Sequence, residues 1–514
     1  MMLYRVFSIL LLYGGFMQNY AQGSGKPNII FIMADDLGYN DIGYHAKNHN
    51  SDMKTPFLDA MAERGIKLEN YYVQPRCTPS RSQLLTGRQD ISTGLHHAVI
   101  YTGQPNGVPT TLKMLPEQLR DCGYDTHMVG KWHLGFYKNE YLPSNRGFNS
   151  YFGDLNGVSD HFTHTSCSKQ SCGVSMWSSS DGPVNNTWGE YSAHLYARKA
   201  IEAIKKRDIM KPFFLYLSYQ SVHTPLQVPD EYIKPFNHIS DKKRRTYAGM
   251  VLAMDESIQN VTSYLHKVGL LENTIVVFST DNGGITRHGG NNYPYRGGKV
   301  SLYEGGVKAV GFIYGKPLGM RNVTHKGLVH ISDWYPTFLR LSSCPKMEGT
   351  QPLDGFDQLN SIVKKTPSPR HEILHGYDPR FRKVAKTTQY SSQTVYNTEI
   401  RAALRCGPWK LITGHPGPNL AEQPPEYNQR FGIGRMKKGR SDGPIFRRDV
   451  QLYHIESDPT EKIEVSDKYP KVVYRLLNRL SQYTAEAVPV RFPGVDRRSN
   501  TELHGGFWVP WLSK

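Results

Sequence analysis

Long hydrophobic runs are almost absent from this 514-residue chain. The clear one covers residues 6–16, and its eleven positions fall well short of the ~20 that a membrane-spanning helix needs. Arg5 precedes it and the small residues Ala21 and Gly23 follow it, as in a secretory signal peptide. A membrane anchor is the alternative. The short length favours a signal peptide cleaved after Ala21 or Gly23, and therefore a lysosomal or extracellular protein with no stable membrane insertion.

Cysteine is also scarce, with six residues, and we find no internal repeat of solenoid period. A secreted chain permits disulfides, and Cys167 and Cys172, five positions apart in a polar stretch, are the best candidate pair. Asn185, Asn260 and Asn322 stand in N-x-S/T sequences and are candidate glycosylation sites. These three support the secretory route only weakly, because a chain of this length collects some by chance.

Acidic residues are in deficit, since 45 Asp and Glu oppose 62 Lys and Arg and leave a formal charge of +17. Such a surface favours polyanions. Two basic runs, residues 242–245 and 435–440, are expected in polar loops, contain no interleaved aromatic residues and match no nucleic-acid motif. We therefore expect no nucleic-acid partner. A sulfated polysaccharide suits a secreted chain better, although either run could equally be a solvated basic face.

The apolar pattern predicts an α/β fold. Runs rich in β-branched and aromatic residues end abruptly and predict buried strands at residues 28–34, 126–129, 213–219 and 275–280. Helical segments are expected between them, at residues 56–63, 115–121, 193–205 and 245–267. This alternation predicts a large, mostly parallel sheet flanked by helices.

The pattern changes after about residue 355, where a polar, proline-rich stretch begins. Short strands are expected around residues 401–411 and 450–455. A last helix has its apolar stripe at Val472, Val473, Leu476, Leu477 and Leu480, which indicates core packing. We expect a signal peptide at residues 1–23, a catalytic domain at 24–360, and a smaller C-terminal α+β subdomain with a short antiparallel sheet at 361–514.

Polar side chains follow four of the predicted strands, where ligands collect in sheets of this kind. They are Asp35 and Asp36, Lys131 and His133, His223, and Asp281 and Asn282. Adjacent carboxylates after an apolar strand are costly unless a cation or a proton shares them. A solvated turn explains Asp35 and Asp36 equally well when they are taken alone, but the oxygen pattern repeats at Asp281. Oxygen ligands favour Ca²⁺ or Mg²⁺ over zinc.

Residues 77–88, with the sequence Cys-Thr-Pro-Ser-Arg-Ser-Gln-Leu-Leu-Thr-Gly-Arg, are the most specific motif of the chain. They resemble the formylglycine signature of the type I sulfatase family. Cys77 also stands where a loop is expected to enter a helix, so that it faces free N–H groups and the positive end of the helix dipole. A lone cysteine is usually a small buried hydrophobe, but the complete twelve-residue pattern argues against that interpretation.

The resemblance implies an alkaline-phosphatase-like sulfatase fold and a covalent mechanism. A formylglycine-generating enzyme oxidises Cys77 to formylglycine (3-oxoalanine), which hydrates to a geminal diol. One hydroxyl attacks sulfur and expels the substrate alcohol, and loss of the proton from the other expels sulfate and restores the aldehyde. With Cys77 modified, five cysteines remain, so at least one of Cys122, Cys344 and Cys406 is unpaired within the monomer.

The resemblance also implies a role for each polar residue of the motifs. Residue 77 and the oxygens of Asp35, Asp36, Asp281 and Asn282 would hold one Ca²⁺, with Mg²⁺ as the alternative. The remaining residues would act on the diol and on the sulfate. Arg81 would hold the diol, Lys131 would bind sulfate, His133 would steer a diol hydroxyl, and His223 and Lys299 would contact sulfate and protonate the leaving oxygen. At its ordinary pKa of ~6.5, His223 would be largely charged in an acidic compartment.

Segments along nearly the whole mature chain look like the branch that holds arylsulfatases B, I and J, among them residues 69–75, 227–232 and 352–357. That branch implies an aryl sulfate or sulfated glycan substrate, and for arylsulfatase B the 4-sulfate of N-acetylgalactosamine in chondroitin and dermatan sulfate. The chain departs from the pattern at four positions. Gly103 and Gly107 replace cysteines, Val300 replaces a tryptophan and Gly298 replaces a basic residue.

Two other functions remain open from the sequence. A phosphatase or phosphodiesterase of the same superfamily would share the fold, use a hydroxyl such as Thr78 or Ser80 as its nucleophile, and bind two zinc ions. A catalytically silent protein that binds sulfated glycans would keep the fold and lose turnover. The sequence leaves the oligomeric state open.

Overall fold

The computed structural model describes residues 25–345, 350–382, 390, 396–419, 421–431 and 448–513. The predicted signal peptide at residues 1–23 and the basic run at 435–440 lie outside the described residues. Within the described ranges, no helix is long and apolar enough to cross a membrane.

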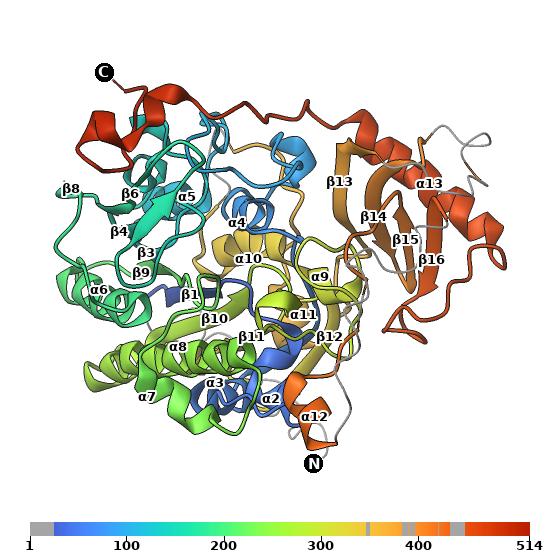
Figure 1. The fold of residues 1–514 in the computed structure, drawn as a ribbon, viewed down its shortest axis with the longest axis horizontal. Coiled ribbons are helices and arrows are strands. Elements are labelled where there is room, and N and C mark those ends of the chain that lie inside the picture. The colour runs from blue at the N-terminus through green and yellow to red at the C-terminus, as the bar shows by residue number, and fades with distance from the viewer. Residues whose placement is uncertain are drawn as a thin grey trace, which may run out of the picture.

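A ten-stranded mixed sheet forms the centre of the molecule (Figure 1). In spatial order its strands are β12 (Val323–His330), β2 (Ile66–Tyr72), β11 (Gly311–Tyr314), β10 (Thr274–Thr280), β1 (Asn28–Ala34), β9 (Phe213–Ser218), β3 (Asp125–Gly130), β4 (Ser150–Asp154), β7 (Met176–Ser178) and β8 (Gly182–Pro183). The neighbours from β10 to β4 pair in parallel, whereas β11, β7 and β8 run antiparallel to their partners. Every residue of β1, β9 and β10 is buried, which explains why these strands read as continuous apolar runs.

Helices cover both faces of this sheet and complete three layers. The helices of this domain are α2 (Gly43–Ala46), α3 (Pro56–Glu63), α4 (Cys77–Thr86), α5 (Leu115–Asp121), α6 (Ser192–Lys206), α7 (Asp230–Ile233), α8 (Lys242–Lys267), α9 (Glu304–Val307), α10 (Trp334–Leu341) and α11 (Leu359–Lys364). Apolar residues of α4, α5 and α10 share one core cluster with Phe31, whereas α3, α6 and α8 share the other with Ile32. Successive strand residues point to opposite faces, so one strand supplies both cores. The predicted α/β class is confirmed.

A second, four-stranded antiparallel sheet follows in the chain, at the right of Figure 1. It contains β13 (Glu372–Arg382), β14 (Ile400–Cys406), β15 (Trp409–Thr413) and β16 (Val450–His454), and α13 (Pro470–Ala485) lies against it; the short helix α12 (Pro425–Arg430) stands apart from it. Leu404 faces α13, while its neighbour Ala403 packs with Leu302 and Tyr303 of the large domain. The small sheet is therefore fixed between its own helix and the larger unit.

Four of the six cysteines are paired in disulfides. Cys167 and Cys172 join the two strands of the hairpin β5 (Thr165–Cys167) and β6 (Cys172–Val174). A second bond joins Cys122 to Cys344, which the sequence left unassigned. Cys77 and Cys406 are free, and Cys77 is the buried one of the two.

The chain after α13 leaves the small sheet and returns along the large domain to its far side, as the red trace in Figure 1 shows. Backbone bonds tie Trp508 to Val174 and Leu512 to Tyr137, both at 2.9 Å. The returning segment also fills space beside Gly103, whose φ is +83° and where an added Cβ would lie 2.7 Å from the Ser499 hydroxyl. The structure thus packs tightly at Gly103, one of the positions where the resemblance implied a cysteine.

The basic run at residues 242–245 was expected in a polar loop, and that prediction is wrong. These residues form the first turn of α8, where the Asp241 side chain accepts a hydrogen bond from the Arg244 N–H. The Arg244 side chain is fully buried and forms ion pairs with Asp41 and Glu426. Part of the run is therefore structural rather than a surface for polyanions.

Candidate active site

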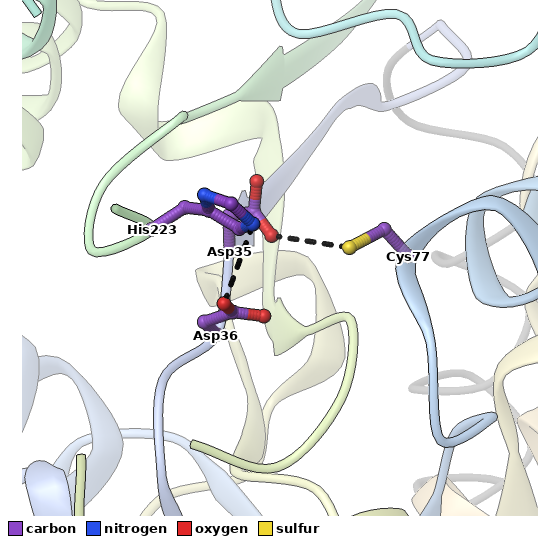
Figure 2. A group of neighbouring side chains, drawn as sticks. All are labelled: Asp35, Asp36, Cys77 and His223. Carbon is purple, nitrogen blue, oxygen red and sulfur yellow. Dashed lines mark hydrogen bonds and ion pairs between the residues drawn. The ribbon is translucent and has the colours of Figure 1, made fainter. Parts of the chain in front are cut away.

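The ends of four neighbouring parallel strands bring the predicted polar residues together. Asp35 follows β1, Asp281 follows β10, Lys131 follows β3, and His223 lies in the loop after β9. Ligating atoms of Asp35, Asp36, Cys77 and His223 lie within 4.8 Å of one another, and all four residues are buried. Figure 2 shows the carboxylates and the imidazole on one side and Cys77 approaching from α4 on the other.

Asp36 has a left-handed backbone conformation, with φ of 62°, which is uncommon for residues other than glycine. Its backbone N–H donates to Asp281 Oδ1 at 3.2 Å, and its Oδ1 accepts from Asn282 Nδ2 at 2.7 Å. Two buried oxygens of this group, Asp36 Oδ2 and Asn282 Oδ1, have no hydrogen-bond partner. Because buried oxygens are normally satisfied, these two indicate a place for a cation.

Cys77 is the first residue of α4, so its side chain stands at the positive end of that helix. Its Sγ lies 3.1 Å from Lys299 Nζ and 3.6 Å from Asp35 Oδ1. Burial raises the pKa of the thiol to about 12, although Lys131 and Lys299 act in the opposite direction. The unmodified residue is therefore a neutral thiol held inside a charged cluster.

Arg81 lies one helical turn after Cys77 and is completely buried. Its Nε and NH2 donate to Asp281 Oδ2 at 3.1 and 2.9 Å, and NH2 lies 3.7 Å from Asp35 Oδ2. NH1 donates to the Ser218 hydroxyl and to the Lys131 carbonyl. Arg81 thus connects three strand ends and compensates the charge of two carboxylates. Ser218, the last residue of β9, was not singled out from the sequence.

Two lysines and one histidine complete the charged cluster. Lys131 pairs with Asp35, and Lys299 pairs with Asp36. His223 Nε2 lies 3.5 Å from Asp36 Oδ2. Burial alone would raise the pKa of Asp35, but Lys131, His223 and Arg81 outweigh it and hold the pKa well below its ordinary value.

The expectation that His223 keeps an ordinary pKa is wrong for this arrangement. Burial and the neighbouring Lys299 lower the pKa of the imidazole, and Asp36 and Asp35 only partly offset them. For Lys299, burial acts downwards but Asp36 and Cys77 outweigh it, so its pKa lies well above the ordinary value. Lys299 is therefore the cation that faces Cys77.

His133 lies near the cluster, although its imidazole points to a different neighbour. Its Nε2 is 3.0 Å from the Ile100 carbonyl oxygen, and its buried Nδ1 has no hydrogen-bond partner. Burial, with Lys131 and Arg81, lowers its pKa well below the ordinary value. His133 also lines a small cavity together with Tyr101 and Asn156.

The residues present fit one hard divalent cation. Asp35, Asp36, Asp281 and Asn282 offer only oxygens, which is the ligand type of Ca²⁺ and Mg²⁺. The unpartnered Asp36 Oδ2 and Asn282 Oδ1 supply two of these oxygens. Burial and the nearby Asp35 raise the pKa of Asp281 to about 6, the shift expected when carboxylates crowd together.

Comparisons with known proteins are in keeping with this geometry. The sequence profile of the Sulfatase family matches residues 27–343. Arylsulfatase J of Mus musculus is 43% identical over 496 residues, which cover 96% of this chain and 81% of that protein. N-acetylgalactosamine-6-sulfatase of Mus musculus is 32% identical over 361 residues, 66% of each chain.

Solved structures with a similar fold agree with the family match. The crystal structure of Ps i-CgsB in complex with k-i-k-neocarrahexaose has a TM-score of 0.74 and 28% identity, and covers 93% of this chain and 98% of that one. The PsFucS1 sulfatase from Pseudoalteromonas sp. has a TM-score of 0.67 at 22% identity over 93% and 94% of the two chains, which supports the fold alone. The fold, the buried cluster and these likenesses define a sulfuric ester hydrolase. The chain belongs to the Sulfatase family.

Proposed function

We propose that this protein hydrolyses sulfate esters through a formylglycine made from Cys77. The position of Cys77 carries the proposal: its Sγ lies in the first turn of α4, 3.1 Å from Lys299 Nζ and 3.6 Å from Asp35 Oδ1. The modified residue would supply a hydroxyl nucleophile that can later release sulfate by regenerating its aldehyde. The twelve-residue motif at residues 77–88 is the signal for that modification.

Asp35, Asp36, Asp281 and Asn282 would hold the metal, which we propose to be Ca²⁺. A cation bound there supplies charge stabilisation to a sulfate oxygen and to the nucleophile. The support is the set of four oxygen-bearing side chains, two of which keep an unpartnered buried oxygen. Arg81 holds Asp281 in place through two hydrogen bonds and so orients one side of this set.

Four basic residues of the cluster would act on the sulfate, on the leaving group or on residue 77. Lys131 and Lys299 would bind sulfate oxygens; their support is that Lys131 contacts Asp35, and Lys299 contacts Asp36 and the sulfur of residue 77. His223 and Lys299 would donate the proton to the leaving oxygen, and His133 would orient a hydroxyl of residue 77. Buried, preorganised donors of this kind stabilise charge as it develops, without reorganisation.

The rival hydroxyl nucleophiles are engaged elsewhere. Thr78 Oγ1 donates to the His133 carbonyl and accepts from the Ile100 N–H, each at 3.2 Å. Ser80 Oγ donates to the Gln74 carbonyl and accepts from its N–H. Both hydroxyls therefore stabilise the local fold, which disfavours a phosphatase or phosphodiesterase. A silent glycan-binding protein would not need all the charged groups that surround residue 77.

For the substrate we propose a sulfated glycan, with N-acetylgalactosamine 4-sulfate of chondroitin or dermatan sulfate as the first candidate. One relative is named N-acetylgalactosamine-6-sulfatase, which supports the sugar rather than the 4-position, and the solved structure at 28% identity is a complex with k-i-k-neocarrahexaose. A net charge of +17 suits a polyanion. The two disulfides and the exposed side chains of Asn185, Asn260 and Asn322 support a secretory location, where a formylglycine-generating enzyme would act.

The decisive measurement is the mass of the peptide that contains residue 77, from protein made in a secretory host. A loss of about 18 Da relative to the cysteine form is expected for the aldehyde. Hydrolysis of 4-nitrophenyl sulfate should then fall roughly 1,000-fold or more in Cys77→Ala. Cys406→Ala is the matched control, since it removes the other free cysteine. An unmodified peptide, or normal turnover by Cys77→Ala, contradicts the proposal.

A further inference from the structure

The turn between α6 and β9 presents two large apolar side chains to solvent. Ile209 is 76% exposed and Met210 is 86% exposed, and they are the central residues of a turn that the Lys211 N–H closes on the Asp208 carbonyl at 3.1 Å. Such positions are usually taken by Gly, Asn, Asp, Pro or Ser. A single exposed apolar side chain is ordinary, but two neighbouring ones at the tip of a turn indicate a contact surface.

This turn is held in place from within the fold. Asp208 donates its N–H to Asp125 Oδ2, at the start of β3, at 2.7 Å. Its own carboxylate accepts from the Met210 N–H at 3.0 Å and pairs with Lys211 Nζ at 3.1 Å. The backbone of the tip is therefore ordered before any partner binds, so burying Ile209 and Met210 costs little further backbone entropy.

Basic side chains accompany the two apolar ones. Lys205, Lys206 and Lys211 are exposed, and one acidic residue stands among residues 205–211. The end of α8 lies beside this segment, because Lys205 Nζ is 5.4 Å from the centre of the Tyr264 ring. One turn further along, α8 adds an exposed lysine and a valine that is 41% exposed. We call the whole surface the turn patch, and it consists of residues 205–211, Lys267 and Val268.

Acidic side chains do not offset this charge. The acidic residues that flank the two segments in sequence, Glu202 and Glu272, are paired with Lys199 and Lys316. Asp208 is paired with Lys211 of the patch itself. The turn patch is therefore positively charged around an apolar tip.

The turn patch lies at the edge of the large sheet opposite to the candidate active site. β9 begins at Phe213, directly after the turn, and His223 lies beyond the other end of this strand. The six residues of β9 separate the two edges by roughly 20 Å. α8 leads into β10 at the same edge as the turn, since β9 and β10 both run parallel to β1 between them. A partner on the turn patch therefore leaves the active site uncovered.

We propose that the turn patch binds the surface of an anionic lipid bilayer, with Ile209 and Met210 inserted at the level of the headgroups. Interfacial binding depends on buried apolar area together with attraction between basic residues and anionic lipids, and the turn patch supplies both. A dissolved polyanion would use the lysines and leave the apolar pair in water. The protein binds peripherally in this arrangement, and its active site faces away from the membrane. The proposal is independent of the formylglycine chemistry.

The test measures binding of the whole protein to vesicles by flotation. Vesicles of phosphatidylcholine with about 30% phosphatidylserine are compared with pure phosphatidylcholine at ~0.15 M salt. The wild type should bind the anionic vesicles, and the double variant Ile209→Ser/Met210→Ser should bind them at least ~10-fold more weakly. Lys206→Gln and Lys267→Gln should each weaken binding about 5-fold. Ile463→Ser is the matched control, because it removes an isoleucine that is 65% exposed in another part of the chain.

Insertion of the tip can be measured directly with Met210→Trp. Its fluorescence should be quenched by lipids with brominated acyl chains more strongly than that of the wild type. Ile463→Trp should show no such gain in quenching. Hydrolysis of 4-nitrophenyl sulfate in solution should be the same in all of these variants and in the wild type, because the turn patch lies away from residue 77.

Four results overturn the proposal. The first two are no binding of the wild type to the anionic vesicles, and equal binding by Ile209→Ser/Met210→Ser. The third is an equal loss of binding in Ile463→Ser. The fourth is weaker binding in the lysine variants alone, which would identify the turn patch as a surface for dissolved polyanions.

Discussion

Two buried arginines, Arg81 and Arg244, lie in similar surroundings, but the oxygens of their two clusters differ in whether all of them accept hydrogen bonds. Each has a fully buried side chain and two carboxylate neighbours. Around Arg244, every carboxylate oxygen of Asp41 and Glu426 accepts a hydrogen bond, and the Gly289 carbonyl and the Ser51 hydroxyl take its remaining donors. Around Arg81, the oxygens of Asp35 and Asp281 also accept hydrogen bonds, but Asp36 Oδ2 and Asn282 Oδ1 of the same cluster have no donor.

The difference separates a structural cluster from a functional one. Burying an ion pair is costly, and a complete set of hydrogen bonds is what offsets that cost. The Arg244 cluster reaches that state with protein groups alone. The Arg81 cluster does not, and it also holds Asp36 in a strained backbone conformation. The oxygens without a donor and the strained backbone of Asp36 together indicate that an additional group completes the site.

The largest expected effect comes from removing the unpartnered oxygen of the functional cluster. Asp36→Asn should lower aryl sulfate turnover roughly 100-fold or more, because one metal ligand and the partner of Lys299 are weakened. Ca²⁺ at 1,000 times its Kd should stabilise the chelator-treated wild type by about 4 kcal/mol, and the variant by much less. Urea unfolding with and without Ca²⁺ measures this. Asp230→Asn, at an exposed carboxylate, is the control. Equal Ca²⁺ stabilisation of both proteins contradicts the metal site.

A smaller effect, on stability rather than turnover, is expected in the structural cluster. Glu426→Gln leaves Arg244 short of a buried counter-charge and should cost about 3 kcal/mol of unfolding free energy. Turnover per folded molecule should stay the same. The control is Glu63→Gln, which breaks a surface pair with Lys47 and should cost less than ~1 kcal/mol. A large loss of turnover per folded molecule in Glu426→Gln would contradict the division into a structural and a functional cluster.

The last effect, no larger than that of Glu426→Gln and present only over part of the pH range, concerns a buried carboxylate whose two oxygens both accept backbone hydrogen bonds. Asp255 accepts from the N–H groups of Leu58 and Phe57, yet burial raises its pKa to about 6. The folded protein therefore binds a proton that the unfolded chain has lost at these pH values. The contribution to stability is complete below pH ~4 and is lost as the pH rises through 6, by about 3 kcal/mol at most.

Asp255→Asn should remove that pH dependence. Urea unfolding between pH 4 and 7 should give a flatter slope of unfolding free energy for the variant than for the wild type. Asp230→Asn, with an exposed side chain, should keep the wild-type slope. An unchanged slope in Asp255→Asn would show that the carboxylate titrates normally despite its burial.

Much of the fold was readable from the sequence because its central strands are buried on both faces. The predicted strand at residues 28–34 and the helices at 56–63 and 115–121 match β1, α3 and α5 residue for residue. Strands such as β2, β11 and β12 were not predicted, because they lie towards one edge of the sheet and their apolar signal is weaker. The ends of the central strands converge, which is why Asp35 and Asp281 could be expected to meet.

Contacts between distant segments could not be predicted. His97 lies in an irregular segment after α4 and Asp378 lies in β13, 281 positions further along the chain, so no spacing rule brings them together. Arg244 stood within a basic run, and composition cannot distinguish a solvated charge from a buried one. The domain boundary near residue 360 stays a prediction.

The return of the chain after α13 has a consequence for how this protein can be divided. Because residues beyond Ala485 end on the hairpin of β5 and β6 and beside Tyr137, the small sheet is attached to the large unit at both of its ends. In topological terms the small sheet is inserted into the large unit rather than added at its C-terminal end. A truncation that removes the small sheet together with everything after it would also remove the returning segment, whose buried Trp508 packs on the large unit, so neither lobe is a natural unit for separate expression.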